Sequence, residues 1–388
     1  MITPADRTGL INEYYFSQKL KQIEELNKSG DQVINLGIGN PDMMPPENVI
    51  NELKTQVATP NTNGYQSYKG INELREAFSY WYKKYYNVNF NANTEILPLI
   101  GSKEGIMHIS MAYLNPGDKV LVPNPGYPTY SSVSKIVGAE IVSYNLTPES
   151  NWLPDFSELE ELVKGGDVKL MWVNYPNMPT GQPASKELYQ KLVNFGLKHQ
   201  ILICNDNPYS FILNDNPISI FEIEGAKEVC LELNSLSKSH NMAGFRVGMV
   251  GGKPEFIQNI LKIKSNMDSG MYKPVQLAAA KALENSADWY KSINETYINR
   301  RKLVWELFDL LGAKYSTEQV GLFVWAKIPD SFSDAFAFSD KYLETCKVFI
   351  TPGSIFGSNG DKYARISLCS KEHVIKTAID RLKQVVSS

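Results

Sequence analysis

The chain has 388 residues, 43% hydrophobic and 21% charged, which excludes wholesale disorder and exceeds what one compact core usually accommodates. Its 39 basic and 42 acidic side chains give a net charge of −3, so no general positive field attracts nucleic acid or an anionic membrane. No stretch has the roughly eighteen apolar residues of a transmembrane helix, and the polar start lacks the apolar core of a signal peptide. Four scattered cysteines without a CxxC pair favour a reducing compartment, so we expect a soluble cytoplasmic protein.

Strand-like and helix-like stretches alternate through the middle of the chain. The strand candidates are short and apolar, as in strands buried on both faces, and comprise residues 97–100, 119–122, 170–173, 201–204, 229–233 and 247–250. Helices are expected between them, for example over residues 103–113 and 185–197. This alternation predicts an α/β fold with a mainly parallel central sheet flanked by helices.

The last third of the chain has a different pattern. A nearly unbroken helical pattern runs over residues 275–311 without proline and is long enough to lead from one domain into another. Later strands are expected at 321–328, 348–351 and 363–368, with a final helix at 371–385. We therefore expect a large α/β domain over residues 41–285 and a smaller α+β domain formed by both chain ends, residues 1–40 and 286–388.

The most informative segment is Ser-Leu-Ser-Lys at 235–238, followed by an arginine at 246. Lys238 comes just after a predicted buried strand, at the edge of the sheet where open α/β folds bind their ligands. The hydroxyls of Ser235 and Ser237 and the guanidinium of Arg246 could hold a phosphate. A surface lysine in a serine-rich turn is the simpler alternative for this segment alone.

Two further segments follow predicted strands. Asp206 and Tyr209 come directly after the strand at 201–204, although an Asn-Pro turn would explain the same residues. Gly101 opens a Gly-Ser-Lys-Glu-Gly segment between a strand and a helix. N–H groups at such a helix start can cradle a phosphate, but glycine turns of this kind are common.

In this order, these segments resemble the fold type I, class I/II aminotransferases, which use pyridoxal 5′-phosphate (PLP). The resemblance implies that Lys238 forms the Schiff base with the cofactor and that Arg246, Ser235 and Ser237 contact its phosphate. It also implies that Asp206 pairs with the protonated pyridine nitrogen. A carboxylate there favours the charged ring and keeps it an electron sink.

Other cofactor contacts follow from the same resemblance. Tyr209 would donate a hydrogen bond to the phenolic oxygen of the ring. Gly101, Ser102 and Lys103 would bind the phosphate, largely through main-chain groups. Tyr127, in a Pro-Gly-Tyr-Pro segment, would stack on the ring, although with 21 tyrosines in the chain it could equally be structural.

The substrate contacts are implied in the same way. Arg365, in an Ala-Arg-Ile-Ser-Leu segment, matches the arginine that grips the substrate α-carboxylate through two charge-assisted bonds. Gly39 matches a glycine that lies against the substrate. Tyr65 matches a tyrosine that reaches the phosphate of the neighbouring subunit, which implies a homodimer with a shared site. The alternative for Arg365 is a structural salt bridge, for Gly39 a turn, and for Tyr65 an ordinary core or surface aromatic.

One position departs from the family pattern. Met178 stands where the family has an asparagine that donates to the phenolic oxygen of the ring, and a thioether cannot donate. Asn177 is one residue out of register and would point the other way in an extended segment. We therefore expect Tyr209 alone to support this oxygen, so that the Schiff base has a higher pKa than in relatives with the asparagine.

The resemblance implies an enzyme that moves the α-amino group of an amino acid to a 2-oxo acid by a ping-pong mechanism. A PLP-dependent carbon–sulfur lyase or decarboxylase on the same fold is the alternative, and a non-catalytic PLP-binding regulator is a weaker one. The four histidines lack the spacing of metal ligands, so no metal is expected. The opening stretch resembles the branch that includes LL-diaminopimelate aminotransferases, but the sequence leaves the substrate open.

Overall fold

The computed structural model describes residues 2–386, and its largest sheet has seven strands. In chain order these are β2 (Ile96–Leu99), β3 (Lys119–Asn124), β4 (Glu140–Asn145), β5 (Val168–Val173), β6 (Leu202–Asp206), β7 (Cys230–Ser235) and β8 (Gly248–Gly252). Their order across the sheet is β2-β8-β7-β6-β5-β3-β4. Only β8 runs antiparallel to its neighbours. The predicted mainly parallel α/β sheet is confirmed.

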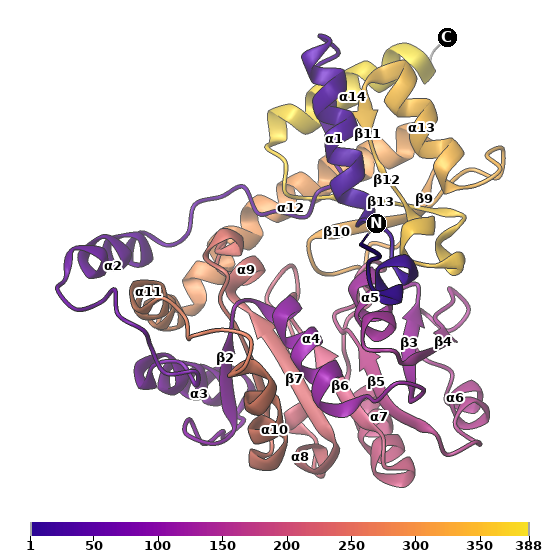
Figure 1. Ribbon diagram of the computed structural model, residues 1–388. Coiled ribbons are helices and arrows are strands. Elements are labelled where there is room, and N and C mark those ends of the chain that lie inside the picture. Colours follow the sequence, from indigo (N-terminus) through magenta and orange to yellow (C-terminus); the bar gives the residue numbers. More distant parts are fainter. Residues whose placement is uncertain (1, 387–388) are drawn as a thin grey trace.

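Helices cover both faces of this sheet (Figure 1). The helices of this part of the chain are α2 (Glu47–Ala58), α3 (Asn72–Tyr86), α4 (Ser102–Tyr113), α5 (Pro128–Ile136), α6 (Phe156–Leu162), α7 (Lys186–His199), α8 (Ala226–Val229), α9 (Leu236–Ser239), α10 (Pro254–Lys264) and α11 (Lys273–Leu283). Of these, α2 packs on α11 rather than on the sheet. Apolar side chains of α4, α5 and α10 pack on one face, and those of α3 and α7 belong to the larger core on the other. Alternate strand residues serve the two cores: Trp172 faces the first, and Met171 and Val173 the second.

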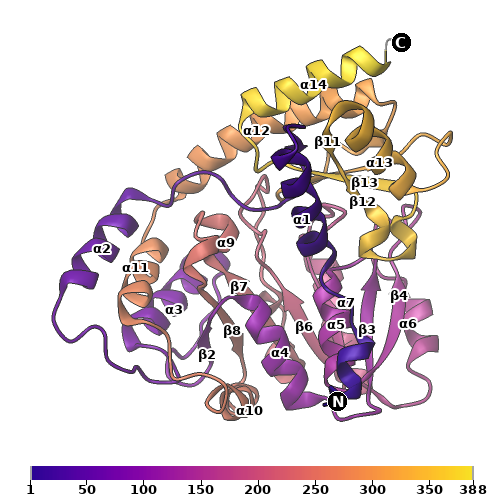
Figure 2. The same ribbon diagram turned by 45° about the horizontal axis from the view of Figure 1, so that its top comes forward.

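Both chain ends meet in a second layer beyond one end of the sheet (Figures 1 and 2). It contains α1 (Tyr15–Lys28), α12 (Ala287–Leu310), α13 (Ala335–Cys346), α14 (Glu372–Val386), β1 (Ile34–Asn35), β9 (Lys314–Tyr315), β10 (Phe323–Lys327), β11 (Val348–Phe349), β12 (Thr351–Pro352) and β13 (Tyr363–Ser367). Strands β12, β13, β10 and β9 form an antiparallel sheet in that order, and β1 pairs with β11. The division into domains at residues 40 and 285 stays a prediction.

The helical pattern predicted over residues 275–311 is interrupted in the structure, so the single long helix was wrong. Helix α11 ends at Leu283 and α12 begins at Ala287. The Ser286 hydroxyl accepts a hydrogen bond from the Asp288 N–H and so caps the start of α12. A serine that caps a helix start competes with continued helix, which explains the break. Within residues 2–386, none of the helices combines the length and apolar character needed to cross a bilayer.

Candidate active site

Lys238 lies on the short helix α9, directly after the central strand β7. The Ser235 hydroxyl caps this helix by accepting a hydrogen bond from the Ser237 N–H, 3.1 Å away. The Lys238 amine donates to the Gly39 carbonyl at 2.6 Å. Burial lowers the pKa of Lys238 below its ordinary value, which brings the amine closer to the neutral form that a base or nucleophile requires.

Asp206 is the last residue of the neighbouring strand β6 and is buried. Its Oδ2 accepts a hydrogen bond from the Tyr130 hydroxyl at 3.0 Å, whereas Oδ1 has no hydrogen-bond partner among the described residues. Burial raises the pKa of Asp206 to about 7, against opposing effects of the Tyr130 hydrogen bond and the charge of Lys238. A buried carboxylate oxygen without a partner is costly, so this atom is poised to meet a cationic donor.

A positively charged corner lies where α4 begins. Gly101 precedes the helix at φ 81°, and a Cβ atom there would lie only 2.1 Å from Nη2 of Arg246. Arg246 in turn donates to the Ile100 carbonyl at 3.3 Å. The ammonium of Lys103 lies 4.9 Å from the ring centre of Tyr14, and burial together with Arg246 lowers its pKa. Two cations and the free N–H groups of a helix start therefore converge on one place, which suits a phosphate.

Arg365 lies on β13, on the opposite side of the cavity from the sheet edge, and is buried. One guanidinium nitrogen donates to the Gly37 carbonyl at 3.0 Å, and the other lies 3.1 Å from the sulfur of Met178. The guanidinium carbon is 3.9 Å from the ring centre of Phe323 and 4.6 Å from that of Phe356. Burial lowers the pKa of Arg365 to about 10, so it remains charged at neutral pH.

These groups line a single cavity of about 670 Å³ between the sheet edge and the second layer. It brings together most of the predicted site residues: Gly39, Ser102, Lys103, Tyr127, Asp206, Tyr209, Ser235, Ser237, Lys238, Arg246 and Arg365. Gly101 stands directly behind Arg246. Tyr65 is 92% exposed and is absent from the cavity lining, so the chain alone does not bring it to the site.

Several lining residues escaped the sequence analysis. Asn174 follows strand β5, and its amide donates to the Asp206 carbonyl and accepts from the Met178 N–H at 2.8 Å. Its position after a predicted buried strand was a usable signal. Tyr130 lies on α5, one turn after Tyr127. Its only signal in the sequence was the helical spacing of these two aromatic residues. The wall contributed by α1, which includes Phe16, Ser17, Leu20 and Lys21, had no local signal, because only the tertiary fold brings that helix to the cavity.

Comparison with known proteins identifies the family. The model of the family "Aminotransferase class I and II" matches residues 31–382. An LL-diaminopimelate aminotransferase of Halothermothrix orenii is 40% identical over 98% of this chain and 97% of its own, and one of Aquifex aeolicus is 36% identical over 98% of both. A substrate-bound BacF structure from Bacillus subtilis superposes with a TM-score of 0.94 at 36% identity, covering 99% of this chain and 98% of that one. The chain therefore belongs to the class I and II aminotransferases.

Proposed function

We propose that the cavity around Lys238 is the catalytic site of this PLP-dependent aminotransferase and that LL-diaminopimelate is its amino donor. The observation that carries the proposal is the convergence in one cavity of Lys238, Asp206, Arg246 and Arg365. Transfer of an amino group between an amino acid and a 2-oxo acid needs an amine, a group for the ring nitrogen, a phosphate anchor and a carboxylate anchor. These four residues supply one of each.

The residues present fit PLP. The unpartnered Oδ1 of buried Asp206 suits a protonated ring nitrogen, and glycine at position 101 leaves the room beside Arg246 that any other side chain would fill. PLP, when bound, supplies an aldehyde that bonds covalently to amines and a ring that takes up electrons. Lys238, Asp206, Tyr209, Tyr127 and Arg246 would hold it, together with Ser102, Lys103, Ser235 and Ser237.

The division of labour among the protein groups follows from their chemistry. Arg365 would hold the substrate α-carboxylate in a planar two-bond fork, with the wall around Gly39 behind the substrate. Lys238, with its lowered pKa, would take the proton from the substrate Cα atom. The aromatic rings of Phe323 and Phe356 against Arg365 keep water away from this carboxylate site, which strengthens the pairing.

Two arguments support LL-diaminopimelate. Relatives that align with nearly the whole chain are LL-diaminopimelate aminotransferases. This diacid carries a second carboxylate, and Lys21, whose ammonium pairs with the exposed Glu13, lines the same cavity as Arg365. A cation beyond the reacting centre favours such a substrate over alanine, methionine or an aromatic amino acid.

A half-reaction screen tests the donor. Loss of the absorbance of the enzyme-bound cofactor is followed after mixing with LL-diaminopimelate, aspartate, alanine, methionine or tyrosine. We expect LL-diaminopimelate to react with a kcat/KM at least about tenfold above the monocarboxylic amino acids alanine, methionine and tyrosine, the equivalent of one additional ion pair in a partly desolvated site. Equal or faster reaction with a monocarboxylic amino acid would contradict this choice of donor but would leave the aminotransferase site intact.

We also propose that the chain works as a homodimer in which Tyr65 reaches the phosphate site of the partner. Support comes from exposed apolar side chains in two adjacent segments, which include Tyr65, Tyr68, Met267 and Tyr272. These segments touch, since a Cβ atom at Gly270 would lie 2.5 Å from the Gln66 carbonyl. Exposed apolar groups gathered in one place mark interaction surfaces. The molar mass in solution tests the proposal against the 43.7 kDa of one chain.

Met178 gives a prediction of its own. Because its thioether has no donor, we expect Met178→Asn to add an N–H toward the ring oxygen and to lower the pKa of the lysine-bound cofactor. The pKa should fall by about 1–2 units, since a hydrogen bond to a charged group contributes about 1.5–3 kcal/mol. A pH titration of the cofactor absorbance measures it. Met178→Leu, which keeps the volume and adds no donor, is the control; a raised or unchanged pKa in Met178→Asn would count against the idea.

A further inference from the structure

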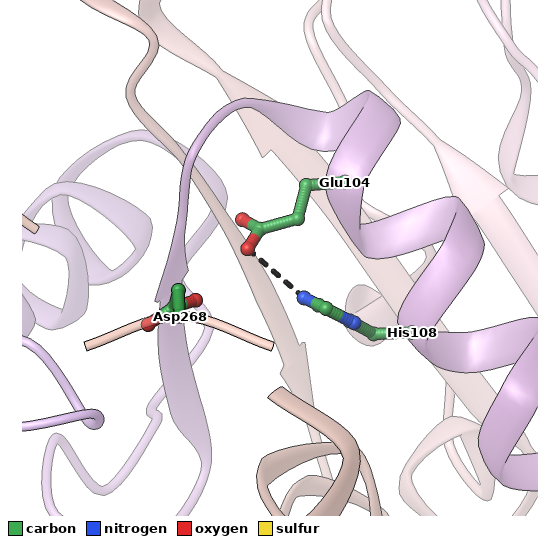
Figure 3. A group of neighbouring side chains, drawn as sticks. All are labelled: Glu104, His108 and Asp268. Carbon is green, nitrogen blue, oxygen red and sulfur yellow. Dashed lines mark hydrogen bonds and ion pairs between the residues drawn. The ribbon is translucent and has the colours of Figure 1, made fainter. Parts of the chain in front are cut away.

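Four polar side chains cluster behind the phosphate corner: Glu104 and His108 on α4, Lys264 at the end of α10 and Asp268 in the loop that follows. We call them the Glu104 quartet. Figure 3 shows Glu104, His108 and Asp268. His108 Nε2 lies 2.9 Å from Glu104 Oε1. The buried Lys264 ammonium pairs with Asp268 Oδ2 and lies 4.0 Å from the same Glu104 oxygen.

Glu104, His108 and Asp268 offer ligand atoms within 4.8 Å of one another, which is a spacing that a metal ion could use. The Lys264 ammonium, however, already lies between the two carboxylates. The cluster thus contains its own cation. The role of the cluster therefore depends on the second carboxylate oxygen of Glu104, Oε2.

That second oxygen, Glu104 Oε2, accepts a hydrogen bond from the Ile100 N–H. The contact closes the turn that carries Gly101, which as the residue preceding α4 offers no side chain to cap the helix. The first N–H groups of a helix have no acceptor within it. Because Glu104 bonds to Ile100 instead of to these groups, it holds the turn in shape while leaving the N–H groups of α4 available to an anion.

The position of Glu104 carries an electrostatic penalty that Lys264 removes. A carboxylate in the first turn of a phosphate-binding helix repels a phosphate, since both are negative and the site is partly shielded from water. The Lys264 ammonium is almost wholly buried, so its charge acts on Glu104 and Asp268 with little screening by solvent. Lys264 thereby preserves the positive potential that Arg246 and the helix start create.

The same cluster anchors the loop that leads to the exposed apolar segment. Asp268 Oδ1 accepts a hydrogen bond from the Gly270 N–H at 2.8 Å, and Gly270 packs on the backbone of Gln66 and Ser67. Asp268 therefore connects the phosphate corner with the segment next to Tyr65.

We infer that Glu104 and Lys264 are positioning residues for the cofactor phosphate: Glu104 fixes the turn at Ile100 and Gly101, and Lys264 offsets part of the negative charge that Glu104 and Asp268 present. The inference rests on the proposed site, in which this corner binds the phosphate of PLP.

The test compares PLP with pyridoxal, which lacks the phosphate, in titrations of the cofactor-free full-length protein. Lys264→Met removes the ammonium and leaves the carboxylates of Glu104 and Asp268 without a cation, so the negative charge of the cluster rises by one. We expect this variant to bind PLP at least about tenfold more weakly and pyridoxal within about twofold of the wild type, because only the phosphate senses the charge. Adding Glu104→Gln, which removes the charge and keeps an oxygen for Ile100, should restore PLP affinity to within about threefold.

Lys262→Met, an exposed lysine on the same helix, is the matched control and should bind both compounds as the wild type does. Glu104→Ala, which also loses the Ile100 contact, should weaken PLP binding even where Lys264→Met fails to fold. Equal losses for PLP and pyridoxal, or no recovery with Glu104→Gln, would overturn the inference. Wild-type protein that binds PLP no better than pyridoxal would instead refute the proposed phosphate corner itself.

Discussion

Lys238→Ala is expected to lower kcat for transamination by at least about 10²- to 10⁴-fold, the range that a positioned general base contributes. The variant loses both the amine that bonds to the cofactor and the base for the substrate Cα proton. Burial keeps the pKa of this amine low, and its contact with the Gly39 carbonyl places it beside the substrate wall. Among the described residues that line the cavity, the other lysines are Lys21 and Lys103, and Lys103 lies at the phosphate corner over the Tyr14 ring.

Borohydride reduction followed by peptide mass analysis separates the two roles of Lys238. The wild type should carry the reduced cofactor on the peptide with Lys238, whereas Lys238→Ala should bind PLP only without a covalent bond. Lys262→Ala, at an exposed site on α10, should behave as the wild type in both assays. Substantial turnover of Lys238→Ala without an added amine would show that another group serves as the base.

The strands that position these residues were predictable because they are short, buried and mostly apolar and end at polar residues. Cys230–Ser235 is wholly buried and leads directly into the lysine helix, so the pattern marks both the strand and its ligand-binding end. Strand β4 at Glu140–Asn145 was missed for the opposite reason. It is an edge strand with only one fully buried residue, Tyr144, and lacks the continuous apolar run of its neighbours.

The site was predictable where a residue follows a strand and unpredictable where a distant element covers it. Lys238, Asp206 and Gly101 each follow a strand that the apolar pattern marks. The rings around Arg365 come from separate elements: Phe16 from α1, Phe323 from β10 and Phe356 from the loop before β13. Only the packing of both chain ends over the sheet edge brings them together. Tyr65 is exposed in the single chain, and its place at the phosphate site of a partner stays a prediction.

Asp206→Asn should have opposite effects on catalysis and on the stability of the cofactor-free chain. With PLP bound, the ring nitrogen loses its carboxylate partner. Breaking a buried charge pair costs about 3–5 kcal/mol, so kcat should fall by about 10²-fold or more. Asp215→Asn, at an exposed site, is the control and should leave kcat unchanged.

Without PLP, Asp206→Asn should stabilise the chain, because burial raises the pKa of Asp206 from 3.8 to about 7. A carboxyl with a raised pKa contributes its full stability below about pH 4 and loses it as the pH rises through about 7. Above neutral pH, the cost of the buried charge is on the order of 4 kcal/mol, at about 1.4 kcal/mol per pKa unit. Asparagine cannot ionise and avoids this cost.

Thermal unfolding of the two cofactor-free proteins therefore gives a direct comparison. The advantage of Asp206→Asn should be small near pH 4 and grow to a plateau above pH 7, where the wild-type carboxyl is ionised. Saturation with PLP should reverse the order, since the cofactor stabilises only the protein that binds it well. An equal Tm for both cofactor-free proteins at pH 8 would mean that water or another donor already satisfies Asp206 Oδ1. In that case the atom would not be held ready for the ring nitrogen.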